Sequence, residues 1–326
     1  AVHESRKNYK RSRAALRLIR AEIGETLYQR ENIRFRDSSR LLAPLRDGAV
    51  MLETIDKLGS DFNLSADAFA ATRNQLEQRY LESRTRFLQE TRHFDSVLAD
   101  LNEGRRAIQD LPFVNQTFTA FAAGLQRVYR RGRRRQAVAY GDSTNPERFH
   151  DWRKRVKYLW HQMELLGDLW PVMTEEMARE LKQLSTYLGD DNDLAVLDAT
   201  ISDERFATPE HELTQLKDII QWQRHQWQTA AAPLGLRLYA ETPSAFVARY
   251  GTYWDIWHRH QFNGLPEQKY ALIDLPEKLM TISEAATFLN ISRAQIRRLI
   301  KTDAVPAIKV GQNWLISKQS ITEYSP

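Results

Sequence analysis

The stretches VHESRKNYKRSRAALRLIR (residues 2–20) and FHDWRKRVKYLWHQMELL (residues 149–166) decide the fold of this chain. Both contain the pattern His-x-x-Arg-Lys-x-x-Lys, and the second copy, at His150, begins 147 positions after the first, at His3. Spacings of three, four and seven residues place these side chains on one face of an α-helix. The opposite face is apolar in both copies. The sequence therefore predicts two amphipathic helices, each with a cationic stripe.

A second pair of segments indicates that the helical region is duplicated. LLAPLRDGAVML (41–52) matches YLGDDNDLAVLD (187–198) at an offset of 146, nearly the offset of the first pair. Apolar residues recur at helical spacing through residue 262, with sparse Gly and Pro, so we predict an all-α fold of two duplicated helical bundles. The halves cover about 1–110 and 111–262. Helix breaks are expected near residues 60–63, 111–115, 141–146, 167–171, 202–209 and 231–235.

Composition restricts the class of protein. The chain has 326 residues, a net charge of +5 and no cysteine, which excludes disulfides and thiolate chemistry. The chain has no run of 18 apolar residues that would indicate a membrane span. The first residues also lack the apolar core of a signal peptide, so we expect a cytoplasmic protein. Charge is uneven: residues 1–20 carry seven basic side chains and one acidic side chain. This asymmetry favours a local polyanion site.

The cationic stripes allow two interpretations. A run of Lys and Arg is often only a solvated helix face. However, like charges three and four residues apart repel, few acids on the same helices offset them, and the arrangement occurs twice. A bound anion would compensate for that repulsion. Because few aromatic residues interleave with the basic face, phosphate is favoured over nucleobases. For His3 and His150, a packing or capping role stays open, and within such a stripe histidine is expected to be neutral.

The two copies of H-x-x-R-K-x-x-K, followed by LRD-x-x-V and LGD-x-ND-L-A-V-L, resemble the conserved histidine α-helical domain, the CHAD domain. The resemblance covers about 1–262. It implies two helical bundles that face each other across a basic groove, inorganic polyphosphate as the ligand, and association with polyphosphate granules.

The expected polyphosphate-binding set combines four sources. These are the two motif copies, the stripe on the first helix, the aligned pair Arg36 and Lys182, and the basic run RRGRRR at 130–135. The set is His3, Arg6, Lys7, Lys10, Arg13, Arg17, Arg36, Arg130, Arg131, Arg134, His150, Arg153, Lys154, Lys157 and Lys182.

The acidic run GDDNDLAVLD has no predicted metal role. An EF-hand loop that started at Asp191 would need Gly at position six and Glu at position twelve, where the chain has Val196 and Ser202. We interpret Asp47 and Asp193 as helix N-caps that also pair with the cationic stripes. No phosphate loop, HExxH or G-x-S-x-G motif is present, so no catalytic residue, metal or cofactor is predicted.

Residues 277–326 follow a Gly/Pro-containing linker at 263–276 and have a different sequence pattern from the long helical region. The segment TISEAATFLNISRAQIRRLIKTDAVPAIKVGQNWLI resembles the excisionase-like winged helix-turn-helix family, with two short helices and a short β-hairpin. Ser292 is placed to cap the second, recognition helix. The expected DNA-binding residues are Ser292, Arg293, Gln295, Arg297, Arg298, Lys309 and Asn313. A helix-turn-helix used only for protein contacts is the alternative.

Together these patterns predict a non-enzymatic protein that binds inorganic polyphosphate in the cytoplasm, at polyphosphate granules, with double-stranded DNA as a second partner and no membrane partner. Such a protein could tether granules to the nucleoid. One alternative is a general nucleic-acid-binding protein that grips phosphodiester backbones. The other is a polyphosphate-processing enzyme.

Overall fold

A computed structural model describes residues 2–65, 67–89, 92–109, 111, 117–206, 208–262, 279–302, 304–305, 307–310 and 313–324. The chain divides into two compact units, residues 1–257 and residues 258–326, and each is considered by itself. The predicted linker at 263–276 lies outside the described residues. Within the described part of the chain, no helix is long and apolar enough to span a membrane.

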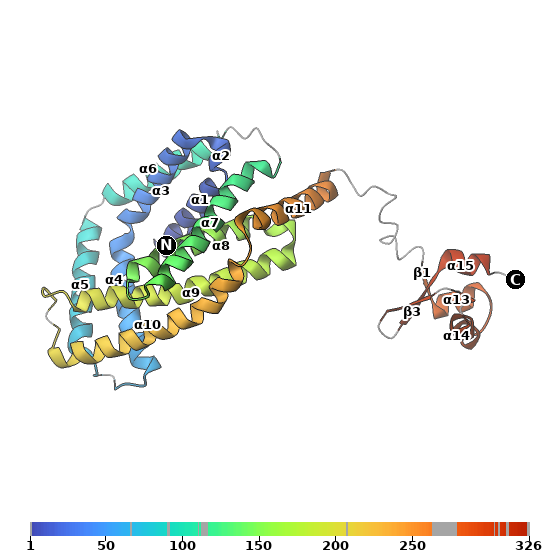
Figure 1. The fold of residues 1–326 in the computed structure, drawn as a ribbon. Coiled ribbons are helices and arrows are strands. Elements are labelled where there is room, and N and C mark those ends of the chain that lie inside the picture. Colours follow the sequence, from blue (N-terminus) through green and yellow to red (C-terminus); the bar gives the residue numbers. More distant parts are fainter. Residues whose placement is uncertain are drawn as a thin grey trace. The chain divides into compact units, whose positions relative to one another are not determined.

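The first unit consists of α-helices and one short 3-10 turn (Figure 1). Its elements are α1 (Val2–Leu18), α2 (Arg20–Ile23), α3 (Glu25–Leu41), α4 (Ala43–Asp61), α5 (Ala70–Gln89), α6 (Arg92–Gln109), α7 (Thr119–Gly141), α8 (Pro146–Leu165), η1 (Gly167–Leu169), α9 (Pro171–Ile201), α10 (Glu210–Leu238) and α11 (Pro243–Phe262). The all-α prediction for this region is confirmed.

The helix bounds follow the repeat that the sequence shows. Helix α9 starts at Pro171, which lies 146 positions after Glu25, the first residue of α3. In the first half the corresponding stretch is interrupted at Leu42, between α3 and α4, whereas α9 runs unbroken for 31 residues. The long helices α9 and α10 lie side by side, with α8 packed on α9 (Figure 1). The element order is therefore that expected of a duplication.

One expected break is wrong. Helix α10 continues through Pro233 to Leu238, although the Pro and Gly residues at 231–235 predicted an end. The packing explains this result, because a Cβ atom at Gly235 would lie 2.7 Å from the Trp152 ring, so the helix backbone sits directly on the core. In the turn before the proline, the Tyr140 hydroxyl donates to the Gln228 carbonyl at 2.7 Å. Tertiary contacts thus stabilise a helical turn in which proline removes a backbone hydrogen bond.

The core of the first unit is divided into three clusters, and one of them joins the two halves. Ile55 and Leu76, from α4 and α5, pack with Leu197 and Leu216, from α9 and α10. A larger cluster surrounds Trp152 and is built mainly from α7 to α11. The third is formed mainly by α1 and α3, with Ile23 of α2, Phe87 of α5 and Val97 of α6. Because the first of these clusters spans both halves, the halves are fixed relative to each other.

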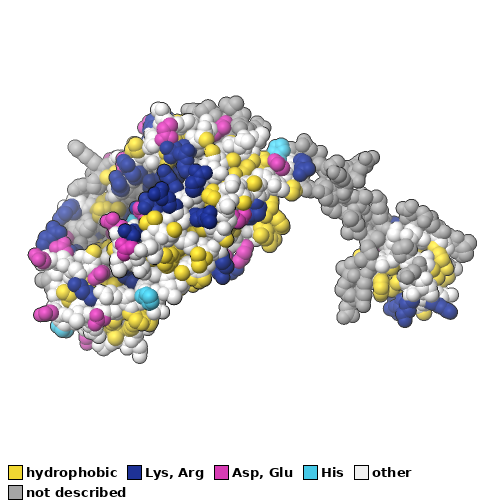
Figure 2. Space-filling view, in the orientation of Figure 1, with side chains coloured by type: hydrophobic (Ala, Val, Ile, Leu, Met, Phe, Trp, Pro, Cys, Tyr) yellow, Lys and Arg dark blue, Asp and Glu magenta, His cyan; other side chains and the backbone are white. Residues whose placement is uncertain are grey.

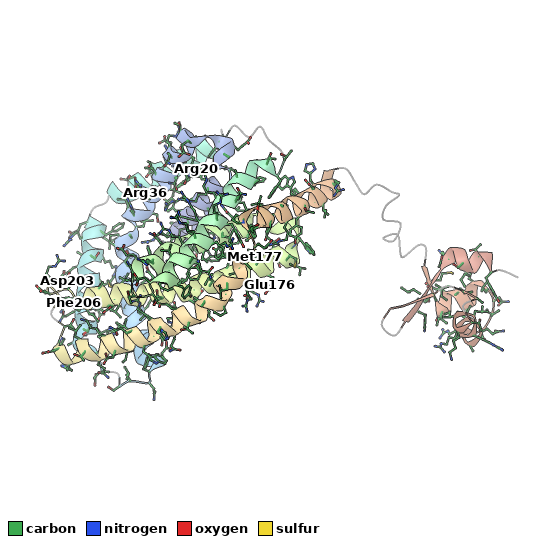
Figure 3. All side chains as sticks on the ribbon, viewed as in Figure 1. Arg20, Arg36, Glu176, Met177, Asp203 and Phe206 are labelled. Carbon is green, nitrogen blue, oxygen red and sulfur yellow. The ribbon has the colours of Figure 1, made fainter. Side chains whose placement is uncertain are left out.

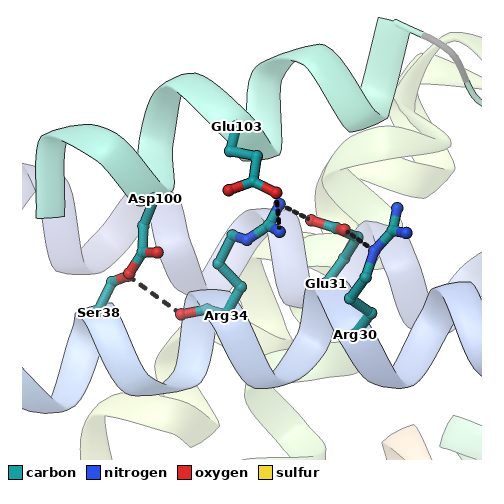
Figure 4. Close-up of polar contacts among 6 residues, drawn as sticks. All are labelled: Arg30, Glu31, Arg34, Ser38, Asp100 and Glu103. Atoms are coloured by element: carbon teal, nitrogen blue, oxygen red, sulfur yellow. Dashed lines mark hydrogen bonds and ion pairs between the residues drawn. The ribbon is translucent and has the colours of Figure 1, made fainter. Parts of the chain in front are cut away.

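Helix α6 is fastened to α3 by a polar network (Figure 4). Glu31 is buried, and Arg34 donates to it at 2.8 Å and to Glu103 at 2.7 Å. One turn further, the Ser38 hydroxyl donates to Asp100 at 2.6 Å. The network compensates the buried Glu31 carboxylate, which would otherwise be costly.

The second unit is a small α/β module, with β1 (Leu279–Thr281), α13 (Ile282–Phe288), α14 (Arg293–Lys301), β2 (Ala307–Val310), β3 (Asn313–Ser317) and α15 (Lys318–Glu323). The strands form an antiparallel sheet in the order β1-β3-β2. The predicted hairpin is confirmed as β2–β3, and β1 adds a strand that was not predicted. Ile296, Ile300 and Ile316 lie in a separate small core.

Candidate functional site

Helix α8, which carries the second cationic stripe, begins at a capped N-terminus. Asn145 accepts a hydrogen bond from the Glu147 amide at 3.0 Å, and Pro146 occupies the first turn, where no amide donor is needed. Trp152, Val156 and Leu159 are then fully buried. The other face of the helix, which carries the cationic stripe, is left open.

That face forms one wall of a groove with a volume of about 1060 Å³. Helices α1, α4, α5, α8 and α9 all contribute to it. The cationic residues that line the groove are Arg6, Lys7, Lys10, Arg46, Arg79, Arg153 and Lys157, with His150 and His161 beside them. Part of the lining is apolar, including Val50, Met51, Ala195 and Trp160. The groove lining is therefore mainly cationic with apolar side chains interspersed.

The groove is lined by equivalent residues of the two sequence repeats. Five aligned pairs contribute: Arg6 and Arg153, Lys10 and Lys157, Arg46 and Asn192, Asp47 and Asp193, and Val50 and Val196. Positions almost 150 residues apart in the sequence thus converge on one cavity. Both copies of the cationic stripe face the same space.

On α1, Arg6 is the anchored cation. Its guanidinium donates to the Leu42 carbonyl at 3.1 Å and lies 3.6 Å from the Asp47 carboxylate. Lys7 is more exposed and lies 3.8 Å from Glu4. Burial raises the pKa of Asp47, although Arg6 and Lys10 oppose that rise. Asp47 is thus a partial counterion inside the groove.

On α8, Arg153 packs against the backbone of α9. A Cβ atom at Gly189 would lie 3.1 Å from the Arg153 guanidinium, so glycine allows this close approach. The Nε atom of Arg153 is buried and has no hydrogen-bond partner within the described part of the chain. Desolvation lowers the Arg153 pKa, while Asp193 and Asp190 oppose the shift. A buried, unsatisfied guanidinium donor is costly, and an anion in the groove would reduce that cost.

The two equivalent lysines have strongly lowered pKa values. Desolvation, followed by Arg153 and Arg6, lowers the pKa of Lys10 to about 8. Desolvation, followed by Arg153 and Lys10, lowers the pKa of Lys157 to about 7. The empty groove therefore disfavours the charged form of both lysines, mainly because they are buried.

Burial, with Lys154 and Arg153 nearby, lowers the pKa of His150, in line with the neutral histidine expected from the sequence. The side chain of its counterpart, His3, lies outside the described part of the chain.

The expectation that Asp47 and Asp193 cap helices is wrong. Asp47 lies inside α4, whose N-cap is Leu42, and Asp193 lies in the second half of α9. Because α9 is continuous, the GDDN segment has no helix start to cap. Asp193 instead accepts a hydrogen bond from the side-chain amide of Asn192 at 3.2 Å and partly opposes the lowering of the Lys10 and Lys157 pKa values. Its role is electrostatic.

Comparison with known protein families finds one matching domain in each of the two units. The family model of the CHAD domain matches residues 1–202. This chain belongs to the CHAD family. A helix-turn-helix domain model matches residues 279–324. No curated protein and no solved structure matches the chain.

Several residues expected to bind the ligand of the CHAD domain lie outside the groove. Arg36 is on α3 and pairs with Asp37 at 2.7 Å (Figure 3). Lys154 is exposed and bonds Asp151 at 3.0 Å. The others not found in the groove lining are Arg13, which donates to Asn32 at 3.2 Å, Arg17, Arg130, Arg131, Arg134 and Lys182. For these residues, the sequence pattern identified a charged helix face but not what faces it.

The structure also adds groove residues that the sequence did not single out for binding. Arg46 precedes Asp47 on α4, and its alignment with Asn192 was the available signal. Arg79 comes from α5, donates to the Arg205 carbonyl at 3.0 Å and lies over the Phe206 ring. It belongs to no motif, so only the packing of α5 brings it to the groove.

In the helix-turn-helix module, α14 is capped as expected. The Ser292 hydroxyl accepts from the Gln295 amide at 3.2 Å, and Gln295 Oε1 accepts from the Ser292 amide at 2.8 Å. Both side chains are therefore engaged in the cap. Arg293, Arg297 and Arg298 are exposed on α14. The side chains of Lys309 and Asn313 lie outside the described part of the chain.

Among the described residues, no group of three or more His, Asp or Glu side chains is arranged to hold a metal ion. The acids that do line the groove, such as Asp47, lie beside cations.

Proposed function

We propose that the groove of the CHAD domain binds inorganic polyphosphate without processing it. The observation that carries this proposal is the convergence of equivalent cations, Arg6 with Arg153 and Lys10 with Lys157, on one cavity. A linear chain that carries about one charge per phosphate offers repeated oxygen acceptors to both stripes at once. Arginine forks and lysine point charges both suit such oxygens.

The main alternative is a nucleic-acid backbone in the same groove. Sequence-tolerant binding of single strands normally uses several aromatic rings as stacking platforms. Trp160 is the one Phe, Tyr or Trp side chain among the described groove-lining residues, and its ring stacks on His161 with centroids 4.6 Å apart. The groove therefore favours an anion without bases.

Paired variants test the groove directly. Arg6→Ala with Lys10→Ala, and Arg153→Ala with Lys157→Ala, should each weaken binding of long-chain polyphosphate by at least about tenfold, since each lost charge-assisted hydrogen bond contributes about 1.5–3 kcal/mol at most. Lys154→Ala is the matched control, because it removes a lysine of α8 that lies outside the groove. Calorimetric titration, with circular dichroism for folding, provides the measurement. If either folded double variant binds like the parent, its stripe is a solvated face.

Competition and turnover experiments test the two alternative functions of the groove, general nucleic-acid binding and polyphosphate processing. Single-stranded RNA should not displace polyphosphate, whereas a general nucleic-acid binder would release it. Incubation of the protein with polyphosphate and Mg²⁺ should release no orthophosphate above a buffer blank. Steady release that depends on the groove cations would instead establish a polyphosphate-processing enzyme.

For the second unit we propose double-stranded DNA binding through α14. Arg293, Arg297 and Arg298 are exposed, while Ile296 and Ile300 fill the core, so α14 presents a basic outer face. A helix of this kind can read the major groove. Gln295 contributes less than the sequence suggested, because its Oε1 is used in the cap.

With both ligands bound, the protein would tether polyphosphate granules to DNA in the cytoplasm. The test is co-sedimentation of labelled duplex DNA with polyphosphate-coated beads in the presence of the full chain. Arg297→Ala with Arg298→Ala should abolish DNA capture and leave the protein on the beads. DNA capture that survives this change would show that α14 is not the DNA-binding surface.

A further inference from the structure

A second cluster of arginines lies on the other side of α8 from the groove. Five guanidinium groups and two tyrosine rings, from the α1–α2 corner, α3, α7 and α8, surround a depression of about 20 Å³. On α8, Arg155 and Tyr158 belong to this cluster, whereas Arg153 and Lys157 line the groove. Figure 2 shows a dense patch of Lys and Arg where Figure 1 draws α1 and α7.

The acids near the cluster do not balance its charge. Arg20 forms a two-bond pair with Glu25, at 2.7 and 2.5 Å. Arg127 and Arg131, by contrast, are exposed and make no hydrogen bond or ion pair within the described part of the chain. The Nε atom of Arg155 is buried and has no partner among the described residues. Three guanidinium groups therefore keep donors available.

Two tyrosine rings position the guanidinium planes. Arg17 lies over the Tyr158 ring at 4.0 Å, Arg155 lies 5.8 Å from the same ring, and Arg20 lies over Tyr28 at 4.2 Å. A guanidinium that stacks by its face keeps its N–H groups at its edge, available to a planar or tetrahedral oxyanion. The rings thus hold the arginines in place without neutralising them.

Keeping these charges together is unfavourable in the empty protein. Desolvation lowers the Arg17 pKa; Tyr158 and Tyr28 oppose this shift, and repulsion from Arg13 and Arg155 adds to it. Arg127 and Arg131 are also one helical turn apart on α7, a spacing at which like charges repel. The arrangement becomes favourable when an anion is bound between the groups.

We propose that this cluster is a second anion site, and that it takes the terminal phosphate group of a small phosphorylated molecule. The size of the depression supports this ligand, because about 20 Å³ has room for roughly one water-sized group and so admits the tip of a phosphate group rather than a chain lying along it. The groove, at about 1060 Å³, can hold a chain lying along it. A terminal group offers three oxygens to Arg127, Arg131 and Arg155, whereas a diester offers only two. The site is independent of the function proposed for the groove.

The test uses the full chain and the arginine Nε–H signals of its ¹H–¹⁵N spectrum. Titration with pyrophosphate should shift the Arg155 signal, assigned by its loss in Arg155→Lys, with saturation at millimolar concentration or below. Dimethyl phosphate, a diester without a terminal group, should shift it at least tenfold less at equal concentration. Equal responses to the two probes would overturn the assignment to terminal phosphates.

Variants separate this site from the groove. Arg127→Ala with Arg131→Ala should abolish the pyrophosphate shift of Arg155 and leave long-chain polyphosphate binding by the groove unchanged. Arg134→Ala, an exposed change on the same helix and outside the depression, is the matched control for the shift. Arg6→Ala with Lys10→Ala should leave the Arg155 response intact. If that groove variant abolishes the response, or if the α7 double variant keeps it while folded, there is no second site.

Discussion

Binding of polyphosphate should weaken steeply as pH rises, because two groove lysines titrate near neutrality. The pKa of Lys157 is about 7 and that of Lys10 about 8 in the empty groove. Arg6, Arg153 and Asp193 also face these lysines, and Asp47 acts on Lys10. An anion in the groove favours the charged lysines, so a lysine that is neutral in the empty groove takes up a proton when polyphosphate binds. At high pH the proton concentration is low, so this proton uptake becomes less favourable and the affinity falls.

The size of the effect follows from linkage. For each lysine, affinity scales as (1 + 10^(pKa bound − pH)) divided by (1 + 10^(pKa free − pH)). If binding restores the ordinary value of 10.5, the loss between about pH 6.5 and about pH 9 is roughly seventyfold for Lys157 and roughly tenfold for Lys10. Incomplete restoration reduces both factors, so we expect a combined loss of at least about tenfold. Burial lowers the pKa values of His150 and His161 as well, and both line the same groove, so the variant below is needed to isolate the lysine contribution.

The assay is calorimetric titration of long-chain polyphosphate at fixed ionic strength across this pH range, in buffers of different ionisation enthalpy so that proton uptake is measured directly. Lys10→Arg with Lys157→Arg keeps the charge and removes the titration of both lysines, so its profile should be much flatter than that of the parent. Lys154→Arg, outside the groove, should keep the parent profile. A parent profile as flat as that of the arginine variant would refute the reasoning.

Four further outcomes are expected. The logarithm of the polyphosphate affinity should fall steeply and linearly with the logarithm of salt concentration, because the cations displace condensed counterions; a flat dependence would show that charge does not carry the affinity. A chain truncated after Phe262 should stay folded and bind polyphosphate within tenfold of the full chain in the same titration. Lys157→Met should raise the melting temperature at pH 7, because it removes an amine whose charged form the fold disfavours. The gain should shrink as pH rises, because the lysine of the parent then loses its proton. Gly124→Ala should destabilise the domain by at least about 2 kcal/mol in urea unfolding, because the new Cβ would lie 2.0 Å from the Leu18 carbonyl oxygen.

The helical class could be predicted from the sequence because it follows from the local spacing of apolar and charged residues. The duplication could be predicted because the same spacing pattern occurs twice. The cationic and apolar faces of residues 2–20 and 149–166 fix which side of each helix is buried, whatever lies against it. The same spacing identified Arg6, Lys10, Arg153 and Lys157, which do line the groove. The exposed basic face of α14 was likewise readable from the separation of Ile296 and Ile300.

Tertiary structure alone decided which charged side chains share a cavity. Arg13 and Arg17 lie on the same stripe as Arg6, yet one bonds Asn32 and the other stacks on Tyr158, because α1 passes from one side of α8 to the other along its length. Arg79 reaches the groove from a helix without any motif. Periodicity gives the direction of a side chain around its own helix axis. It gives neither the crossing of two helices nor the burial that lowers the lysine pKa values, because both arise from contacts between residues far apart in the chain.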